Sequence, residues 1–172
     1  PNWTDRTRWR YRVRAGLTAV LQDDFEVGLR LGAGNVETIN SSDTGINPIS
    51  NNQTLQNNAS KKGIFVDLAY AKWSPINTPR GSGAFTIGKM QNPYVFSSMI
   101  FDSDYTPEGA AGQFGYNLTD KHALGLNTAA FVLDEIGGSN NDPYMFGAQL
   151  RLDSEWTERI SSSAGVAGLL IS

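Results

Sequence analysis

Hydrophobic and polar residues alternate along this chain with the two-residue period of a β-strand. From Trp9 to Leu21, every second residue is apolar or aromatic, and arginine fills the positions between them as far as Arg14. Successive side chains of a strand point to opposite faces, so this segment has one cationic face and one apolar face. The pattern predicts a long first strand that begins at Arg6 and ends at Leu21.

The alternation resumes from Phe25 to Gly32, after a short polar segment at residues 22–24. This arrangement predicts an antiparallel hairpin. Glycine opposite arginine leaves room for the long side chain and lets the sheet bend. Pairing across the turn places Thr18 near Gly28, Gly16 near Arg30, and Arg14 near Gly32.

Later segments repeat the alternation, and their polar partners are mostly glycine, amides and a few charged residues. Transmembrane β-barrels show this pattern because lipid-facing and lumen-facing residues alternate along each strand. We therefore predict an all-β, antiparallel transmembrane β-barrel, an up-and-down meander with about eight strands and a single domain over residues 1–172. The apolar sets are Val66, Leu68 and Tyr70; Phe85 and Ile87; Phe114, Tyr116 and Leu118; Leu124 and Leu126; and Tyr144, Phe146, Ala148, Leu150 and Leu152.

Composition agrees with this prediction. The chain has 172 residues, no cysteine and a formal net charge of −3. No window approaches the roughly 20 apolar residues that a membrane helix requires, and barrel strands carry a much weaker hydropathy signal than helices. The sequence opens at Pro1 without a signal peptide and closes on an apolar segment, residues 164–172. We expect it to be a fragment of a longer barrel polypeptide.

Short and long connections alternate between the predicted strands, as they do in outer-membrane barrels with short periplasmic turns and long external loops. Aromatic residues also collect beside the short connections, where interfacial girdles lie. The predicted periplasmic connections are 22–24, 74–83, 119–122 and 153–157, and the external ones are 35–62, 91–109 and 135–142. The predicted girdle residues are Phe25, Trp73, Phe85 and Trp156.

Energetics indicates which way the arginines point. One arginine on the lipid face at the bilayer midplane costs about 2–4 kcal/mol. In a water-filled lumen, arginines about 7 Å apart on one face repel each other by only about 0.6 kcal/mol. We therefore predict a pore-lining basic ladder, opposed by carboxylates of the lumen and of an inward-folding or overhanging loop at 91–109. The ladder is Arg8, Arg10, Arg12, Arg14 and Arg30, and the carboxylates are Asp67, Asp102, Asp104 and Glu108.

The residue runs 5–17, 27–31, 50–55, 66–70, 88–93 and 101–109 together resemble the Gram-negative "putative porin" family. The resemblance keeps the same order along most of the chain and includes loops as well as strands. It implies an integral β-barrel of the bacterial outer membrane. Members of the family are considerably longer than this chain, so the resemblance implies a fragment of such a barrel.

We expect a passive channel for ions and small polar solutes, selecting them by the sign of the charges that line a hydrated constriction. Outer-membrane lipid and these solutes are the expected partners, without nucleic acid; monomer and trimer both stay open. The alternative is a soluble envelope protein, either a ligand-binding β-barrel or a carbohydrate-binding β-sandwich. In a soluble barrel the interior would be the apolar side.

No catalytic constellation is present in the sequence, and we expect no enzyme activity and no cofactor. His122 is the single histidine and falls in a predicted turn. The carboxylates Asp102, Asp104 and Glu108 are spaced closely enough to suggest a hard cation. They lack the glycine and terminal glutamate of a helix–loop–helix calcium site, so we predict no metal there.

Overall fold

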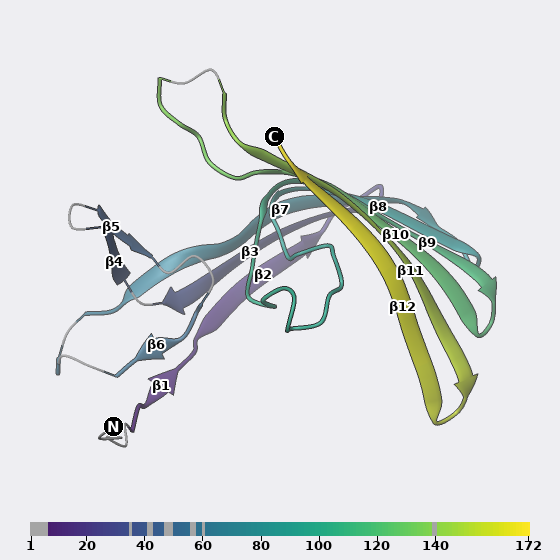
Figure 1. Cartoon of the computed structure of the whole chain (residues 1–172), viewed down its shortest axis with the longest axis horizontal. Helices are drawn as coiled ribbons and strands as arrows, with labels where there is room; N and C mark the ends of the chain where they lie inside the picture. Colours follow the sequence, from purple (N-terminus) through teal and green to yellow (C-terminus); the bar gives the residue numbers. More distant parts are fainter. Residues whose placement is uncertain are drawn as a thin grey trace.

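A computed structural model describes residues 7–34, 36–40, 43–46, 50–55, 58–59, 61–138 and 141–172. All regular elements in this part of the chain are β-strands, and the largest sheet is arched (Figure 1). The strands are β1 (Arg10–Tyr11), β2 (Arg14–Val20), β3 (Phe25–Gly34), β4 (Val36–Asn40), β5 (Asp43–Ile46), β6 (Gln53–Thr54), β7 (Gly63–Asn77), β8 (Gly81–Lys89), β9 (Glu108–Thr119), β10 (His122–Val132), β11 (Tyr144–Thr157) and β12 (Ile160–Ile171).

Eight strands form the arched sheet, in the order β2-β3-β7-β8-β9-β10-β11-β12. Each pairs antiparallel with its neighbours, and only the insertion that contains β4, β5 and β6 interrupts the chain order. The prediction of an all-β antiparallel meander with about eight strands is confirmed. Within the described residues, β2 and β12 are the two edges and do not pair, so closure into a barrel stays a prediction.

Connection lengths alternate as predicted, with short turns at 21–24, 78–80, 120–121 and 158–159 and long connections at 35–62, 90–107 and 133–143. Two predicted turns were wrong in their bounds. Residues 153–157 continue β11, and much of 74–83 is strand. In both places an irregular pairing absorbs the polar residues or proline that had suggested a turn.

The first hairpin has the predicted register, with Thr18 opposite Gly28, Gly16 opposite Arg30, and Arg14 opposite Gly32. Its turn places Asp23 and Asp24 at φ 58° and 62°, in the left-handed region that aspartate tolerates better than most residues.

The predicted first strand is divided, because its N-terminal part changes partner. β2 pairs with β3, whereas β1 pairs with β6 of the insertion, and Leu55 N–H donates to the Trp9 carbonyl at 3.0 Å. The predicted start at Arg6 lies outside the described residues. The predicted loop at 35–62 contains the β4–β5 hairpin and β6. Residues 35, 41–42, 47–49, 56–57 and 60 of this loop also lie outside the described residues.

The sheet has an inner face, which carries Glu26, Gly28 and Arg30 of β3, and an outer face, which carries Phe25, Val27 and Leu29. A β-bulge at Asp67 changes the phase of β7: Leu31 pairs with Val66, but Arg30 pairs with Leu68. The predicted apolar set of β7 was therefore wrong. Val66 lies on the outer face, but Leu68 and Tyr70 share the inner face with Lys72, and Ala69, Ala71 and Trp73 take the outer face.

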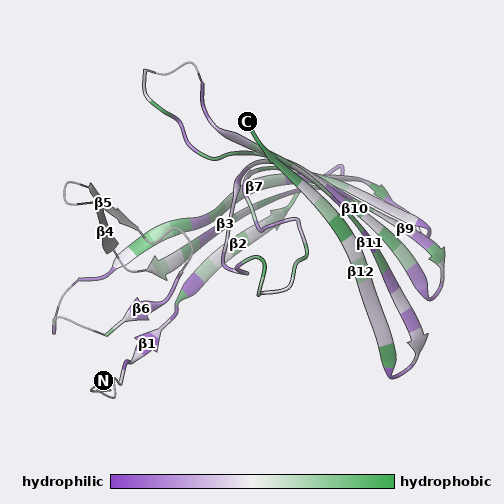
Figure 2. Ribbon diagram, in the orientation of Figure 1, coloured by the Kyte–Doolittle hydropathy of each residue, from purple (hydrophilic) through white to green (hydrophobic). Residues whose placement is uncertain are grey.

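Apolar side chains cover the outer face and remain exposed to its surroundings; for example, Leu29, Phe146 and Leu150 are 48, 46 and 50% exposed. Apolar bands recur along the strands in Figure 2. Near the short turns, an aromatic row crosses four strands, with ring-centroid distances of 5.8 Å for Phe25–Trp73, 6.1 Å for Trp73–Phe85 and 5.4 Å for Phe85–Phe114. Among the described residues, no helix is long and apolar enough to cross a membrane.

Candidate functional site

The connection from β8 to β9, residues 90–107, folds beneath the arch of the sheet (Figure 1), and we call it the inner loop. It starts and ends beside two paired glycines, Gly88 and Gly109, with φ of 110° and 149°. A Cβ on Gly88 would lie 2.4 Å from the Ala69 carbonyl oxygen, and one on Gly109 would lie 2.1 Å from that of Ala130. Glycine is therefore required at both positions.

Aromatic packing holds the middle of the inner loop against the inner face. Tyr94 and Phe131 of β10 are 5 and 1% exposed, and their rings meet edge to face at 6.1 Å. Tyr94 also crosses over Gly147 of β11, where an added Cβ would meet its hydroxyl. Burial raises the pKa of Tyr94 and of Tyr105 in the same loop, because the charged phenolate is disfavoured away from water.

A buried amide fastens the loop to β11. Gln149 is 3% exposed, and its Oε1 accepts from the Val95 backbone N–H at 2.9 Å while its Nε2 donates to the Val95 carbonyl at 2.9 Å. Asn127 of β10 donates to the same Oε1 at 3.1 Å. We call Gln149, Asn127 and Val95 the amide anchor. The Gln149 side chain bonds both the N–H and the carbonyl of Val95, as the backbone of a neighbouring strand would.

Asp104 holds the end of the loop against Arg12 and against Arg14 of β2. Its two carboxylate oxygens accept from Arg12 Nη1 and Nη2 at 3.0 and 2.6 Å, and Arg14 Nη2 donates to Oδ1 at 2.9 Å. Bidentate pairs of this kind are strong and fix geometry. We call Asp104, Arg12 and Arg14 the charged anchor.

Asp67 extends the charged anchor into the sheet. Its side chain is 4% exposed, and Oδ2 accepts from Arg30 Nε at 2.5 Å and lies 3.3 Å from Arg14 Nε. Asn51 Nδ2 donates to its other oxygen at 3.2 Å. Three arginines and two aspartates therefore form one network across β2, β3, β7 and the inner loop.

The structure does not bring the other predicted site residues into this network. Arg8 and Arg10 are exposed ahead of it on the chain. Asp102 accepts from the Asp104 backbone N–H at 2.8 Å and so shapes the loop. Glu108 begins β9, is 64% exposed, and pairs with Lys89 at 3.0 Å. Among the described residues, no three side chains of the metal-binding types are grouped as a metal site.

Sequence reasoning missed several inner-face residues. Tyr70 was assigned to the opposite face, yet its hydroxyl donates to Glu26 Oε1 at 2.8 Å. Lys72 follows on the same face. Gln149 and Asn127 were recognised only as polar partners in the alternation. The pattern of polar and apolar residues does not show that a loop buries them.

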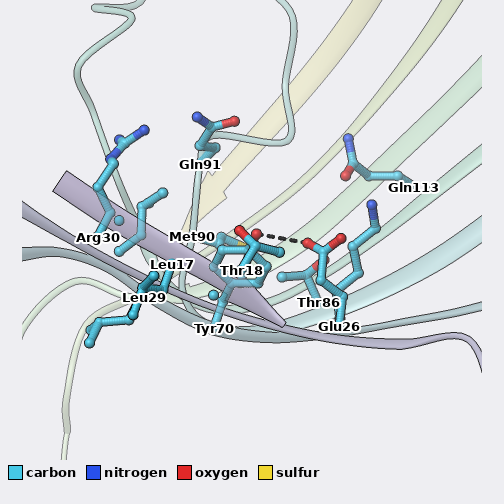
Figure 3. Close-up of a pocket in the computed structure, with 14 residues that line it drawn as sticks. Leu17, Thr18, Glu26, Leu29, Arg30, Tyr70, Thr86, Met90, Gln91 and Gln113 are labelled. Carbon is cyan, nitrogen blue, oxygen red and sulfur yellow. Dashed lines mark hydrogen bonds between the residues drawn. The ribbon is translucent and has the colours of Figure 1, made fainter. Parts of the chain in front are cut away.

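A cavity of about 410 Å³ lies on the inner face, bounded by β2, β3, β7, β8, β9 and the start of the inner loop. In Figure 3, Arg30, Gln91 and Gln113 project on the same side of the sheet as the Glu26–Tyr70 hydrogen bond. Charged groups and amides thus face a space large enough for a small solute.

These features define an all-β antiparallel meander with an apolar outer face and a charged inner face that holds a folded-in loop. The chain belongs to the "Putative porin" family, whose profile matches residues 2–168. No curated protein and no solved structure matches the chain significantly.

Proposed function

We propose that this chain forms part of a transmembrane β-barrel in the bacterial outer membrane, and that the barrel passes ions and small polar solutes by passive diffusion. Membership of a porin family supports a porin-like role and outer-membrane location in general. The partners are lipid on the outer face and solutes on the inner face. We propose neither a cofactor nor an enzymatic reaction.

The observation that carries this proposal is the difference between the two faces. The outer face exposes large apolar side chains over many strands, and contiguous exposed apolar surface of that extent marks a membrane or protein contact. The inner face holds the charged network and the amide anchor. A soluble barrel would have the opposite arrangement, so the soluble alternative is disfavoured.

The inner loop gives the lumen its chemistry. It sets Asp104 against Arg12 and Arg14 and lies beneath the arch of the sheet (Figure 1). Because these charges are paired, they contribute a local field rather than a large net charge. Arg8 and Arg10 make no ion pair within the described residues. We therefore propose a mild anion preference for the channel and assign it mainly to these two arginines.

Substitution of both Arg8 and Arg10 by glutamine tests the channel. In planar bilayers under a salt gradient, the intact wild-type protein is expected to conduct with a mild anion preference, and the reversal potential of the double variant is expected to move toward cation selectivity. The control is Lys121→Gln in the short turn after β9, which removes one positive charge away from the network. Absence of any ion current from the wild type would refute the proposal, and an unchanged reversal potential would exclude these arginines from the conducting path.

Cysteine labelling in intact cells tests the orientation. Ile136→Cys lies in a long connection and Asp120→Cys in a short turn, so a membrane-impermeant thiol reagent is expected to label the first and spare the second. Labelling of Asp120→Cys alone would place the long connections in the periplasm and contradict the proposed topology.

A further inference from the structure

The inner-face cavity beside the start of the inner loop is lined by charges of both signs. Arg30 and Lys72 line it together with one carboxylate, Glu26. Arg30 already has a counter-ion, because its Nε pairs with Asp67, a residue that is not part of the cavity lining. Lys72, by contrast, enters no ion pair within the part of the chain that the structure describes. The Lys72 ammonium is therefore open to pairing with the carboxylate of a solute.

Neutral hydrogen-bonding groups surround that ammonium. The strand register places Lys72 between Glu26 and Thr86 in one row across the inner face, where side chains of neighbouring strands lie about 4.5–5.5 Å apart. Gln91 at the start of the inner loop and Gln113 of β9 complete the lining. These side chains can both donate to and accept from hydroxyl groups.

The carboxylate of Glu26 is fixed in place. Tyr70 donates to its Oε1, and the Tyr70 ring lies across Gly28, where an added Cβ would stand 2.4 Å from it. Fixed in this way, Glu26 offers its second oxygen to a donor in the cavity and repels a second negative charge. A solute with one carboxylate and several hydroxyl groups satisfies Lys72, Glu26 and the neutral groups together.

We propose that this cavity is a solute subsite for small polyhydroxylated monocarboxylates, that is, sugar acids. The carboxylate lies at Lys72, and the hydroxyl groups contact Glu26, Thr86, Gln91 and Gln113. The inference rests on the proposed channel function and adds to it a substrate class and the residues that recognise it.

Partial block of the ion current by gluconate tests the subsite. The intact protein is held in a planar bilayer in KCl, and gluconate is added at rising concentration. We expect a saturable fall in current, with a half-blocking concentration well below that of glucose or acetate. Normal current without saturable block would overturn the subsite and leave the channel standing, whereas no current at all would overturn the channel itself.

Two variants with opposite expected effects make the test specific. Lys72→Gln is expected to raise the half-blocking concentration about tenfold, because it removes one charge-assisted hydrogen bond. Glu26→Gln keeps an acceptor for Tyr70 and for a solute hydroxyl group. It removes the repulsion between the Glu26 carboxylate and the gluconate carboxylate at the neighbouring Lys72, so it is expected to lower that concentration a few-fold. The matched control is Arg151→Gln, which removes an inner-face cation of β11 that pairs with Asp153 at 2.7 Å and lies outside the cavity lining.

An equal effect of Lys72→Gln and Arg151→Gln would show that gluconate senses only the charge of the lumen and would overturn the proposal. If acetate blocked the current as strongly as gluconate, the hydroxyl groups would have no role, and the proposal would again be overturned. Stronger block by glycine than by gluconate would assign the cavity to zwitterions and refute the sugar-acid class.

Discussion

The two attachments of the inner loop differ in their chemistry. On the side of β2, β3 and β7, the charged anchor holds the loop through ion pairs whose arginines are 38 and 25% exposed. On the side of β11, the amide anchor holds it through neutral hydrogen bonds of a side chain that is 3% exposed. Salt screens exposed charges strongly and buried neutral hydrogen bonds hardly at all. The loop therefore has one attachment that responds to ionic conditions and one that does not.

Depth within the sheet matters as much as charge. Asp67 is the most deeply buried carboxylate of the network, while Asp104 is 13% exposed. Loss of one partner from a buried ion pair leaves an uncompensated charge, which costs far more than the loss of a surface pair. Substitutions of Asp67, Gln149 and Asp104 separate the effect of burial from the effect of charge.

Asp67→Asn is expected to have the largest effect. Arg14 and Arg30 would face each other without their shared counter-ion, and the free energy of unfolding should fall by about 3 kcal/mol. Urea titration of the folded protein in detergent measures this loss. Asp153→Asn is the control, because that carboxylate is 44% exposed beside Arg151 and its loss should cost at most about 1 kcal/mol. Equal losses would show that burial does not strengthen the network.

Gln149→Leu is expected to have an intermediate effect. The Val95 N–H and carbonyl would lose their partners in a buried place, at a cost of about 2 kcal/mol. The released loop should also make single-channel current larger and noisier, at low and high salt alike. Gln22→Leu in the exposed first turn is the control. Unchanged current in Gln149→Leu would mean that aromatic packing alone positions the loop.

Asp104→Asn is expected to have the smallest effect, about 1 kcal/mol. It removes the charge of the carboxylate that holds Arg12 and Arg14, so its difference from wild type should shrink as KCl rises from about 0.1 to about 1 M, where the Debye length falls from about 10 to about 3 Å. Unfolding measured in both salts checks this. If the difference does not change with salt, the charged anchor is not electrostatic in origin.

Periodicity predicted the meander and the first hairpin register because both depend on local alternation and a short turn. It failed in β7, since Asp67 looks like an ordinary polar position, and nothing local shows that it is an extra residue. It also failed to divide the first strand, because the partner of β1 lies in β6, far along the chain.

The site was predicted only in outline. Contact between arginines and aspartates is expected from the composition and from the predicted inward loop. The contact of Asp104 with Arg12 and Arg14 agrees with that expectation. The place of Glu108 beside Lys89 depends on where β9 begins, and the burial of Gln149 depends on which residue the loop lays over it. Both depend on tertiary contacts, which a short stretch of sequence cannot predict.

The bulge at Asp67 has a consequence for how the chain length can change. A one-residue deletion inside a strand ordinarily turns every later side chain toward the wrong solvent. Here Val66 already faces outward and Leu68 inward, and each keeps its partner on β3 whether or not a residue stands between them. Loss of Asp67 would therefore leave a regular ladder with both faces intact, and its cost would come from the lost counter-ion of Arg14 and Arg30. At this position an insertion adds a charge without disturbing the strand, and a deletion can remove it again.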